Sequence, residues 1–304
     1  MFRKSIIAVG LAISTSHGFC TPVKQPSLLP EPLKLGVYDI PRTFDTLHTV
    51  SFEETWCFWD KYNEALKNHH HSSRLLPQLK AMTARGRTPL ITIEPWPVSS
   101  IGTAEHLLPD IIAGKYDVLI KALARDVNAL GTPSYIRWGP EMEFVHEYPW
   151  ACKPPADYVA AYRHFVTLFK KIAPQSIMIW SPVGNDGLQQ YYPGDDVVDY
   201  VGFSLYEVPA ASTSWFGHPM SFDEWMQNKY PRLSQFNKPL IIAELGVADD
   251  PQKQKEWLLS AFGATVNYPL LQALVYFNAQ DLHSWEKWGA KGAPNWTIDP
   301  AIFK

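Results

Sequence analysis

Charged residues are scarce in this chain, and the two signs nearly balance. Asp, Glu, Lys and Arg make up 19% of the 304 residues, and the formal net charge is −3. So small an excess gives no reason to expect nucleic acid or an anionic membrane surface as a partner. Because hydrophobic residues reach 46%, an intrinsically disordered chain is excluded as well. The length suits one large domain, which we expect over residues 33–304.

Long apolar runs are also missing, so the sequence predicts no membrane helix after its N-terminus. The N-terminus has the pattern of an export signal: a basic start, the short apolar stretch Ile6 to Ile13, and a small-x-small site that ends at Gly18. We therefore expect a signal peptide over residues 1–18 and a flexible segment over residues 19–32. The mature protein is expected to be secreted or periplasmic, with no membrane attachment once the signal is cleaved.

Cysteine is rare, with three residues in the whole chain. Cys20 leaves a lipoprotein open as an alternative, although Phe19 before it is bulkier than the small residue that lipoprotein processing favours. Cys57 and Cys152 fall in predicted loops at the same end of the fold. In an oxidising compartment they are candidates for a disulfide, and the alternative is two free thiols.

Several motifs that announce an active site are absent from the sequence. A GxGxxG fingerprint after the first predicted strand and a Walker A motif are both missing, which weakens a nucleotide-binding interpretation. Neither a serine nucleophile elbow nor HExxH occurs, so an α/β-hydrolase and a zinc peptidase lack support. The run His69 to His71 favours a solvated loop over a metal site, because adjacent side chains point in different directions. We expect neither a metal nor an organic cofactor.

Aromatic residues, by contrast, are plentiful: the chain has 12 Trp, 14 Tyr and 15 Phe. Such residues fill hydrophobic cores. Tryptophan is also suited to sugar-binding clefts, because its flat indole face packs against the C–H face of a pyranose ring. Composition alone leaves both interpretations open.

Strand-like and helix-like segments alternate from residue 33 onward. Eight segments are rich in β-branched and aromatic residues, and amphipathic stretches with three- and four-residue apolar spacing separate many of them. Pro155 and Pro251 stand where helices are expected to begin. Eight such strands predict a (β/α)8 barrel as a single domain rather than an open sheet. The predicted strands are 33–38, 49–53, 89–94, 134–138, 177–180, 200–205, 239–244 and 271–277, and the predicted helices include 75–85, 116–130, 156–171, 222–236 and 252–262.

Two glutamates lie where predicted strands end, Glu141 after the fourth and Glu244 at the end of the seventh. In a (β/α)8 barrel, the carboxyl ends of the strands form the active face. Glycoside cleavage needs such a pair, because one carboxylic acid protonates the leaving oxygen while a second carboxylate attacks or stabilises the anomeric carbon. Arg137, a few residues before Glu141, can place positive charge beneath the nucleophile. The pair therefore predicts a glycosidase site.

At these residues the chain resembles family 26 glycoside hydrolases, which belong to the clan of retaining glycosidases with (β/α)8 barrels. The family is known mainly for endo-β-mannanases, with some β-glucanases and β-1,3-xylanases. The resemblance covers most of residues 33 to 300. It rests on five segments in a matching order: PLITIEPW (89–96), AGKYDVLIKALARDVNALG (113–131), YPGDDVVDYVGFSLYE (192–207), KPLIIAELG (238–246), and YFNAQD (276–281) followed by NWTID (295–299).

The resemblance implies roles for individual residues. Glu141 would be the acid/base and Glu244 the nucleophile, with Tyr206 donating a hydrogen bond to the nucleophile. Three tryptophans match aromatic positions around the substrate: Trp96 and Trp180 beside the scissile bond, and Trp150 on the leaving-group side. One departure is plain. The family usually has a sequence close to HEMN around the acid, and this chain has PEME (140–143), so a side-chain donor is missing there or supplied elsewhere. Glu143 also introduces a second carboxylate near the acid.

These observations together predict a secreted, monomeric, retaining endo-β-glycanase that acts on a β-linked polysaccharide of the mannan or glucan type. Two alternatives stay open. The barrel can be a catalytically silent polysaccharide-binding protein, or a hydrolase that processes the cell's own exopolysaccharide.

Overall fold

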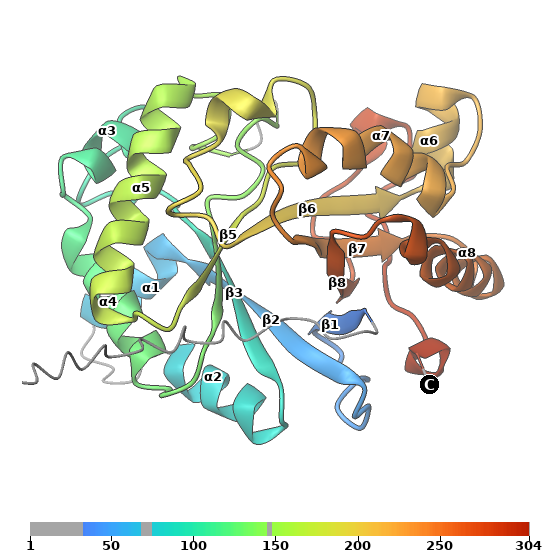
Figure 1. The fold of residues 1–304 in the computed structure, drawn as a ribbon, viewed down its shortest axis with the longest axis horizontal. Coiled ribbons are helices and arrows are strands. Elements are labelled where there is room, and N and C mark those ends of the chain that lie inside the picture. The colour runs from blue at the N-terminus through green and yellow to red at the C-terminus, as the bar shows by residue number, and fades with distance from the viewer. Residues whose placement is uncertain (1–32, 68–74, 145–147, 304) are drawn as a thin grey trace, which may run out of the picture.

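A computed structural model describes residues 33–67, 75–144 and 148–303 of the chain. Eight parallel strands pair in sequence order and close into a barrel (Figure 1). The predicted (β/α)8 fold is therefore confirmed. The expected signal peptide, the segment 19–32 and the run His69 to His71 lie outside the described residues. The strands are β1 Lys34–Asp39, β2 Val50–Phe58, β3 Thr88–Glu94, β4 Tyr135–Trp138, β5 Ile177–Trp180, β6 Tyr200–Glu207, β7 Leu240–Val247 and β8 Leu271–Asn278.

Helices surround the barrel, with α3 to α5 on one side in Figure 1 and α6 to α8 on the other. Each predicted helix is present to within a few residues, and Pro155 and Pro251 stand at the first position of α5 and α8 as expected. Among the described residues, no helix is long and apolar enough to cross a membrane. The helices are α1 Trp59–Lys67, α2 Leu75–Ala84, α3 Leu107–Ile112, α4 Asp117–Asn128, α5 Pro155–Ile172, α6 Pro209–Phe216, α7 Phe222–Ser234 and α8 Pro251–Ala264, and the 3-10 turns are η1 Leu188–Tyr191, η2 Thr265–Asn267, η3 Glu286–Trp288 and η4 Pro300–Phe303.

The inside of the barrel is layered. Alternate residues of each strand face inward, and at one level these residues form an apolar cluster that includes Phe52, Leu90 and Tyr135. Two residues further along the same three strands, the inward positions are polar: Glu54, Thr92 and Arg137. The apolar layer supplies a packed floor, and the polar layer above it begins the active face of the barrel.

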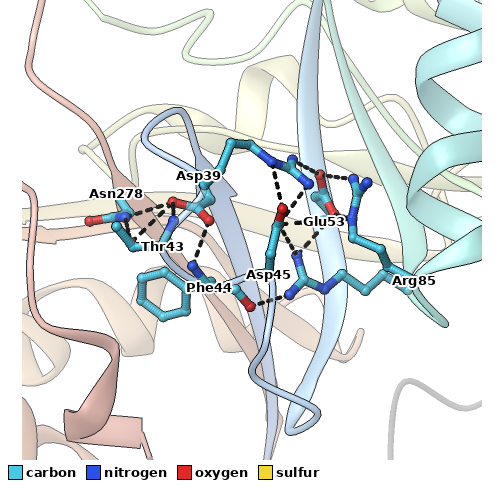
Figure 2. Close-up of polar contacts among 9 residues, drawn as sticks. Asp39, Thr43, Phe44, Asp45, Glu53, Arg85 and Asn278 are labelled. Carbon is cyan, nitrogen blue, oxygen red and sulfur yellow. Dashed lines mark hydrogen bonds and ion pairs between the residues drawn. The ribbon is translucent and has the colours of Figure 1, made fainter.

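The connection from β1 to β2 contains no α-helix, and an ion cluster takes the place of one (Figure 2). Glu53 on β2 is 3% exposed and accepts hydrogen bonds from Arg42 at 2.7 Å, Arg85 at 2.6 Å and Arg87 at 3.0 Å. Arg87 also donates to the carbonyl of Phe44 in the connecting loop. One buried carboxylate thus links this loop to the connection between α2 and β3.

The seam between the first and last strands has its own polar link. Asn278, at the end of β8, donates to Asp39 Oδ1 at 2.7 Å, and Asp39 Oδ2 accepts the Phe44 N–H at 2.8 Å (Figure 2). Because both residues are buried, these bonds are shielded from water and hold the loop against the closed barrel.

Candidate active site

Glu141 lies three residues beyond the end of β4, on a loop with unusual backbone geometry. Its φ is +60°, in the left-handed region, which costs a residue other than glycine on the order of 1–3 kcal/mol. The backbone N–H of Glu141 donates to the carbonyl of Ser181, just after β5, at 2.7 Å. This bond from the neighbouring strand end holds the strained backbone and directs the carboxylate over the barrel mouth.

Glu244 lies within β7, where the pairing of β6 with β7 shifts register and sets it opposite Ser204. The guanidinium of Arg137 donates to Glu244 Oε1, and the Tyr206 hydroxyl donates to Oε2 at 2.6 Å. The hydrogen bond expected from Tyr206 and the charge expected from Arg137 are thus both present, while their catalytic roles stay predictions. Burial and the charge of Glu244 keep the pKa of Tyr206 well above 10, so it remains a donor.

Gly246, two residues beyond Glu244, leaves room for the Tyr206 ring. A Cβ atom at this position would lie 2.7 Å from Tyr206 Cδ1 and 2.8 Å from Trp296 Cε3. Both distances are shorter than a normal carbon–carbon contact, so only glycine fits without moving one of the rings.

One hydroxyl lies between the two glutamates. Ser204 Oγ is 2.5 Å from Glu141 Oε1 and 3.5 Å from Glu244 Oε1. One hydroxyl thus reaches both carboxylates, which makes the two side chains close neighbours. The residues that the sequence pairs across 103 positions therefore share one site.

Arg137 is the centre of positive charge beneath this site. It is fully buried, and its Nη1 is 3.9 Å from Glu54 Oε1 in addition to its contact with Glu244. Burial, together with the charges of Glu244 and Glu94, raises the pKa of Glu54 to about 8, although Arg137 and the 2.5 Å hydrogen bond from Thr92 oppose that rise. Arg137 thus lies between Glu54 and Glu244 and makes its shorter contact with Glu244.

The two facing glutamates differ in electrostatic environment. Burial, and next the charge of Glu244, raise the pKa of Glu141 to about 7, while Arg137 and the Ser204 hydrogen bond oppose the shift. Glu244 instead forms an ion pair with Arg137 and accepts a hydrogen bond from Tyr206. A carboxylic acid beside a carboxylate is the combination that glycoside cleavage requires.

Glu143, the second carboxylate in PEME, faces away from this centre. Its Oε1 accepts the backbone N–H groups of Gly184 at 2.8 Å and Asn185 at 3.3 Å. From the other side, α7 binds the same loop: Lys229 donates to the Val183 carbonyl at 2.6 Å. Glu143 thus fixes the loop after β5 instead of competing for the acid's position.

The expectation that Trp150 lines the substrate cleft is wrong in this structure. Its ring is 0% exposed, stacks on Tyr148 with ring centroids 4.7 Å apart, and donates from Nε1 to the Pro140 carbonyl at 2.7 Å. Tyr148 covers it and donates to Glu141 Oε2 at 3.3 Å. Trp150 therefore supports the loop that carries the acid.

Trp180 was expected beside the scissile bond, but it also lies away from the barrel mouth. Ile179 belongs to the barrel interior, so its neighbour Trp180 points outward into the helix layer, where it is 0% exposed and packs on Tyr192 and Phe236. Trp96, in contrast, is half-buried at the rim, donates to Glu94 Oε2 at 2.7 Å and keeps part of its ring accessible.

The candidate disulfide is not formed, and both Cys57 and Cys152 are free thiols. Cys57 lies within β2, which is longer than predicted, and it is buried in the cluster between barrel and helices. Cys152 is exposed in the loop after β4, with its sulfur 3.5 Å from the Phe144 carbonyl. Cys57 occupies an outward-facing position of β2, so its thiol points into the helix layer and away from the active face. This explains why no disulfide forms.

Sequence reasoning missed an aromatic group at the rim, formed by Tyr38, Trp56 and Phe277. Trp56 and Tyr38 have ring centroids 4.3 Å apart, Phe277 lies 4.8 Å from Tyr38, and all three are partly exposed. They come from β1, β2 and β8, across the mouth from Glu141. The sequence could have indicated Trp56: it follows Glu54 by two residues on the same strand, so both side chains lie on the inward face of β2. In the described part of the chain, no three His, Cys, Asp or Glu side chains are arranged to hold a metal ion.

No protein-family model matches the chain. Two proteins with assigned activities are similar in sequence. Endoglucanase H of Acetivibrio thermocellus is 29% identical over 227 residues, which cover 69% of this chain and 24% of that protein. The beta-1,3-xylanase TXYA of a Vibrio species is 26% identical over 211 residues, which cover 60% of this chain and 43% of the xylanase. The chain thus spans less than half the length of either relative.

A solved structure extends the comparison to the fold. The GH26 beta-mannanase BoMan26A of Bacteroides ovatus superposes with a TM-score of 0.58 at 16% identity, covering 86% of this chain and 82% of that one. At that identity the likeness concerns the fold alone. With the sequence similarity to these relatives, it bears out the predicted resemblance: the chain is a (β/α)8 barrel that is similar to family 26 glycoside hydrolases.

Proposed function

We propose that this protein is a secreted retaining endo-β-glycanase, with Glu141 as acid/base and Glu244 as nucleophile. The observation that carries the proposal is the pair of carboxylates that one hydroxyl reaches at the barrel mouth. A barrel that only bound polysaccharide would have no need for an acid with a raised pKa beside an ion-paired carboxylate.

The reaction would proceed in two steps. Glu141 gives its proton to the leaving glycosidic oxygen while a Glu244 oxygen bonds to the anomeric carbon and the C–O bond breaks. In the second step, Glu141 takes a proton from water, the water oxygen bonds to the anomeric carbon and the ester to Glu244 breaks. Arg137 and Tyr206 hold the attacking carboxylate in position, which is the preorganisation that such a site requires.

The proposed substrate is a β-linked polysaccharide that the protein binds as a monomer. The aromatic rims around the glutamates, Trp96 on one side and Tyr38, Trp56 and Phe277 on the other, offer ring faces to pyranose units. The names of the similar proteins supply the candidates: a β-glucan, a β-1,3-xylan and a β-mannan.

The proposal is tested by offering the protein these three polysaccharides and following the first product by proton NMR. Retention requires that the newly formed reducing end appears first as the β-anomer. Early α-anomer would instead mean inversion and would remove Glu244 from the role of nucleophile. Binding to a polysaccharide without release of reducing ends would favour the silent binding barrel.

The pH dependence of kcat/KM follows from the raised pKa of Glu141. Glu141 must be protonated to act as the acid, so activity should fall about tenfold per pH unit above about 7, the pKa of that carboxyl. Initial rates from pH 4 to pH 9 at low substrate concentration check this expectation. A plateau that extends to pH 9 would show that another group supplies the proton.

A further inference from the structure

Ser204 lies at the centre of the site but belongs to neither catalytic role. It faces inward on β6, directly opposite Glu244 at the point where the β6–β7 register shifts, and it is 5% exposed. Apart from its 2.5 Å and 3.5 Å approaches to the two glutamates, it accepts a hydrogen bond from Arg137 Nη2 at 3.2 Å. Its oxygen is therefore surrounded by two carboxylates and a guanidinium.

The number of hydrogen bonds that a hydroxyl can make limits what Ser204 does. A serine hydroxyl has one proton to donate and two lone pairs. Arg137 occupies one lone pair, which leaves one donor and one acceptor for two carboxylates. Ser204 can thus donate to only one glutamate at a time, and it can accept from the other only when that glutamate carries a proton.

The proposed reaction moves negative charge between these two glutamates. At rest, Glu244 is the carboxylate and Glu141 the acid, so the Glu141 O–H can donate to Ser204 while Ser204 donates to Glu244. After the first step, Glu141 has lost its proton to the leaving oxygen and Glu244 is a neutral ester. The Ser204 hydroxyl then donates to Glu141, the new carboxylate. The second step restores the first arrangement.

We propose that Ser204 is a positioning residue whose single hydrogen bond changes direction with each step and follows the charge from Glu244 to Glu141 and back. The proposal rests on the assigned roles of the two glutamates. It explains why a small hydroxyl occupies this place: a carboxylate there would add another charge, and an alkyl side chain would leave both glutamates without a neutral donor between them.

The test compares Ser204→Ala with Ser181→Ala. Ser181 also accepts a hydrogen bond from Arg137, at 2.9 Å from Nε, yet its hydroxyl contacts neither glutamate, so it is a matched control for loss of a serine bound to Arg137. Glutamate side chains labelled with carbon-13 are titrated by NMR without substrate, and the signal missing in Glu141→Gln identifies Glu141. Because the hydroxyl bonds differently to the protonated and to the ionised form of Glu141, Ser204→Ala should move the Glu141 titration midpoint by about one pH unit, and Ser181→Ala should leave it in place.

Kinetics add a second readout. On a polysaccharide that the wild type hydrolyses, Ser204→Ala should lower kcat about tenfold to a hundredfold with little change in KM, and the basic limb of its pH profile should move together with the NMR midpoint. An unchanged midpoint, or an equal shift in the control, would overturn the role of Ser204. A shifted midpoint in a protein that cleaves none of the polysaccharides would support the hydrogen bond to Glu141 and overturn the proposed function instead.

Discussion

Replacing Glu244 by glutamine should lower kcat on the polysaccharide substrate by about a thousandfold or more, the scale on which removal of a nucleophile is usually felt. Glutamine has nearly the same shape, but its amide cannot form the ester, and it brings an NH₂ group toward the Arg137 guanidinium. KM should change little, because the aromatic rims remain. Reducing-end release under saturating substrate measures the effect.

A second variant separates the two roles. Glu141→Gln should be equally slow on polysaccharide, but much less impaired in the first step on an aryl glycoside whose leaving group needs no proton. Glu244→Gln should be inactive on both substrates. Glu256→Gln, at an exposed position on α8, controls for the amide substitution itself. If Glu244→Gln kept near wild-type rates on polysaccharide, Glu244 would not be the nucleophile.

Replacing Glu53 by glutamine should lower the free energy of unfolding by about 3–5 kcal/mol, the usual cost of breaking a buried ion pair from one side. The loss comes mainly from Arg87, whose side chain is 2% exposed, and from Arg85, which donates to both carboxylate oxygens and loses one of these acceptors. Arg42 is 41% exposed and contributes little. Urea denaturation at pH 7, followed by tryptophan fluorescence, measures the change.

Acid should reveal the same ion cluster. Burial raises the pKa of Glu53, but hydrogen bonds from Arg85, Arg42 and Arg87 together lower it below its ordinary 4.5. Because the folded-state pKa is the lower one, this contribution is complete above about pH 4.5 and is lost as pH falls through the folded-state pKa. The stability gap between wild type and Glu53→Gln should therefore narrow from pH 6 to pH 3. Arg42→Gln, at the exposed member, should cost less than about 1 kcal/mol. An equal loss of stability in Arg42→Gln and Glu53→Gln would contradict the conclusion that the buried ion pairs, and not the exposed one, stabilise the fold.

Much of the fold, and the meeting of Glu141 and Glu244 at one site, could be predicted because their signals are local. Apolar strands covered on both faces, and amphipathic helices between them, predict a barrel, and a carboxylate at a strand end then falls on the active face. Glu141 and Glu244 can be singled out from the sequence because they follow the fourth predicted strand and end the seventh. The ion cluster around Glu53 could not be predicted in this way, because Arg42, Arg85 and Arg87 meet it only after the chain has folded.

The misplaced tryptophans show where such reasoning fails. The strand Ile-Met-Ile-Trp (177–180) is apolar at every position, so nothing in the sequence says which face Trp180 occupies, and the register puts it outside the barrel. The burial of Trp150 depends on the conformation of the loop after β4, in which Tyr148 covers the Trp150 ring. Ser204 could not be singled out from the sequence either, because serines are common in strands. Its place in the site follows only from the register of β6 with β7, which brings it opposite Glu244.

The missing side chain at Gly246 limits how this active site can vary. Because the Tyr206 ring occupies the space where a Cβ would lie, even alanine would push the ring away from its hydrogen bond with Glu244. Position 246 is thus closed to the substitutions by which a binding cleft is usually altered. If the proposed function holds, changes in substrate preference have to come from the loops and rim aromatics, which can be exchanged while Glu244 keeps its hydrogen bond from Tyr206.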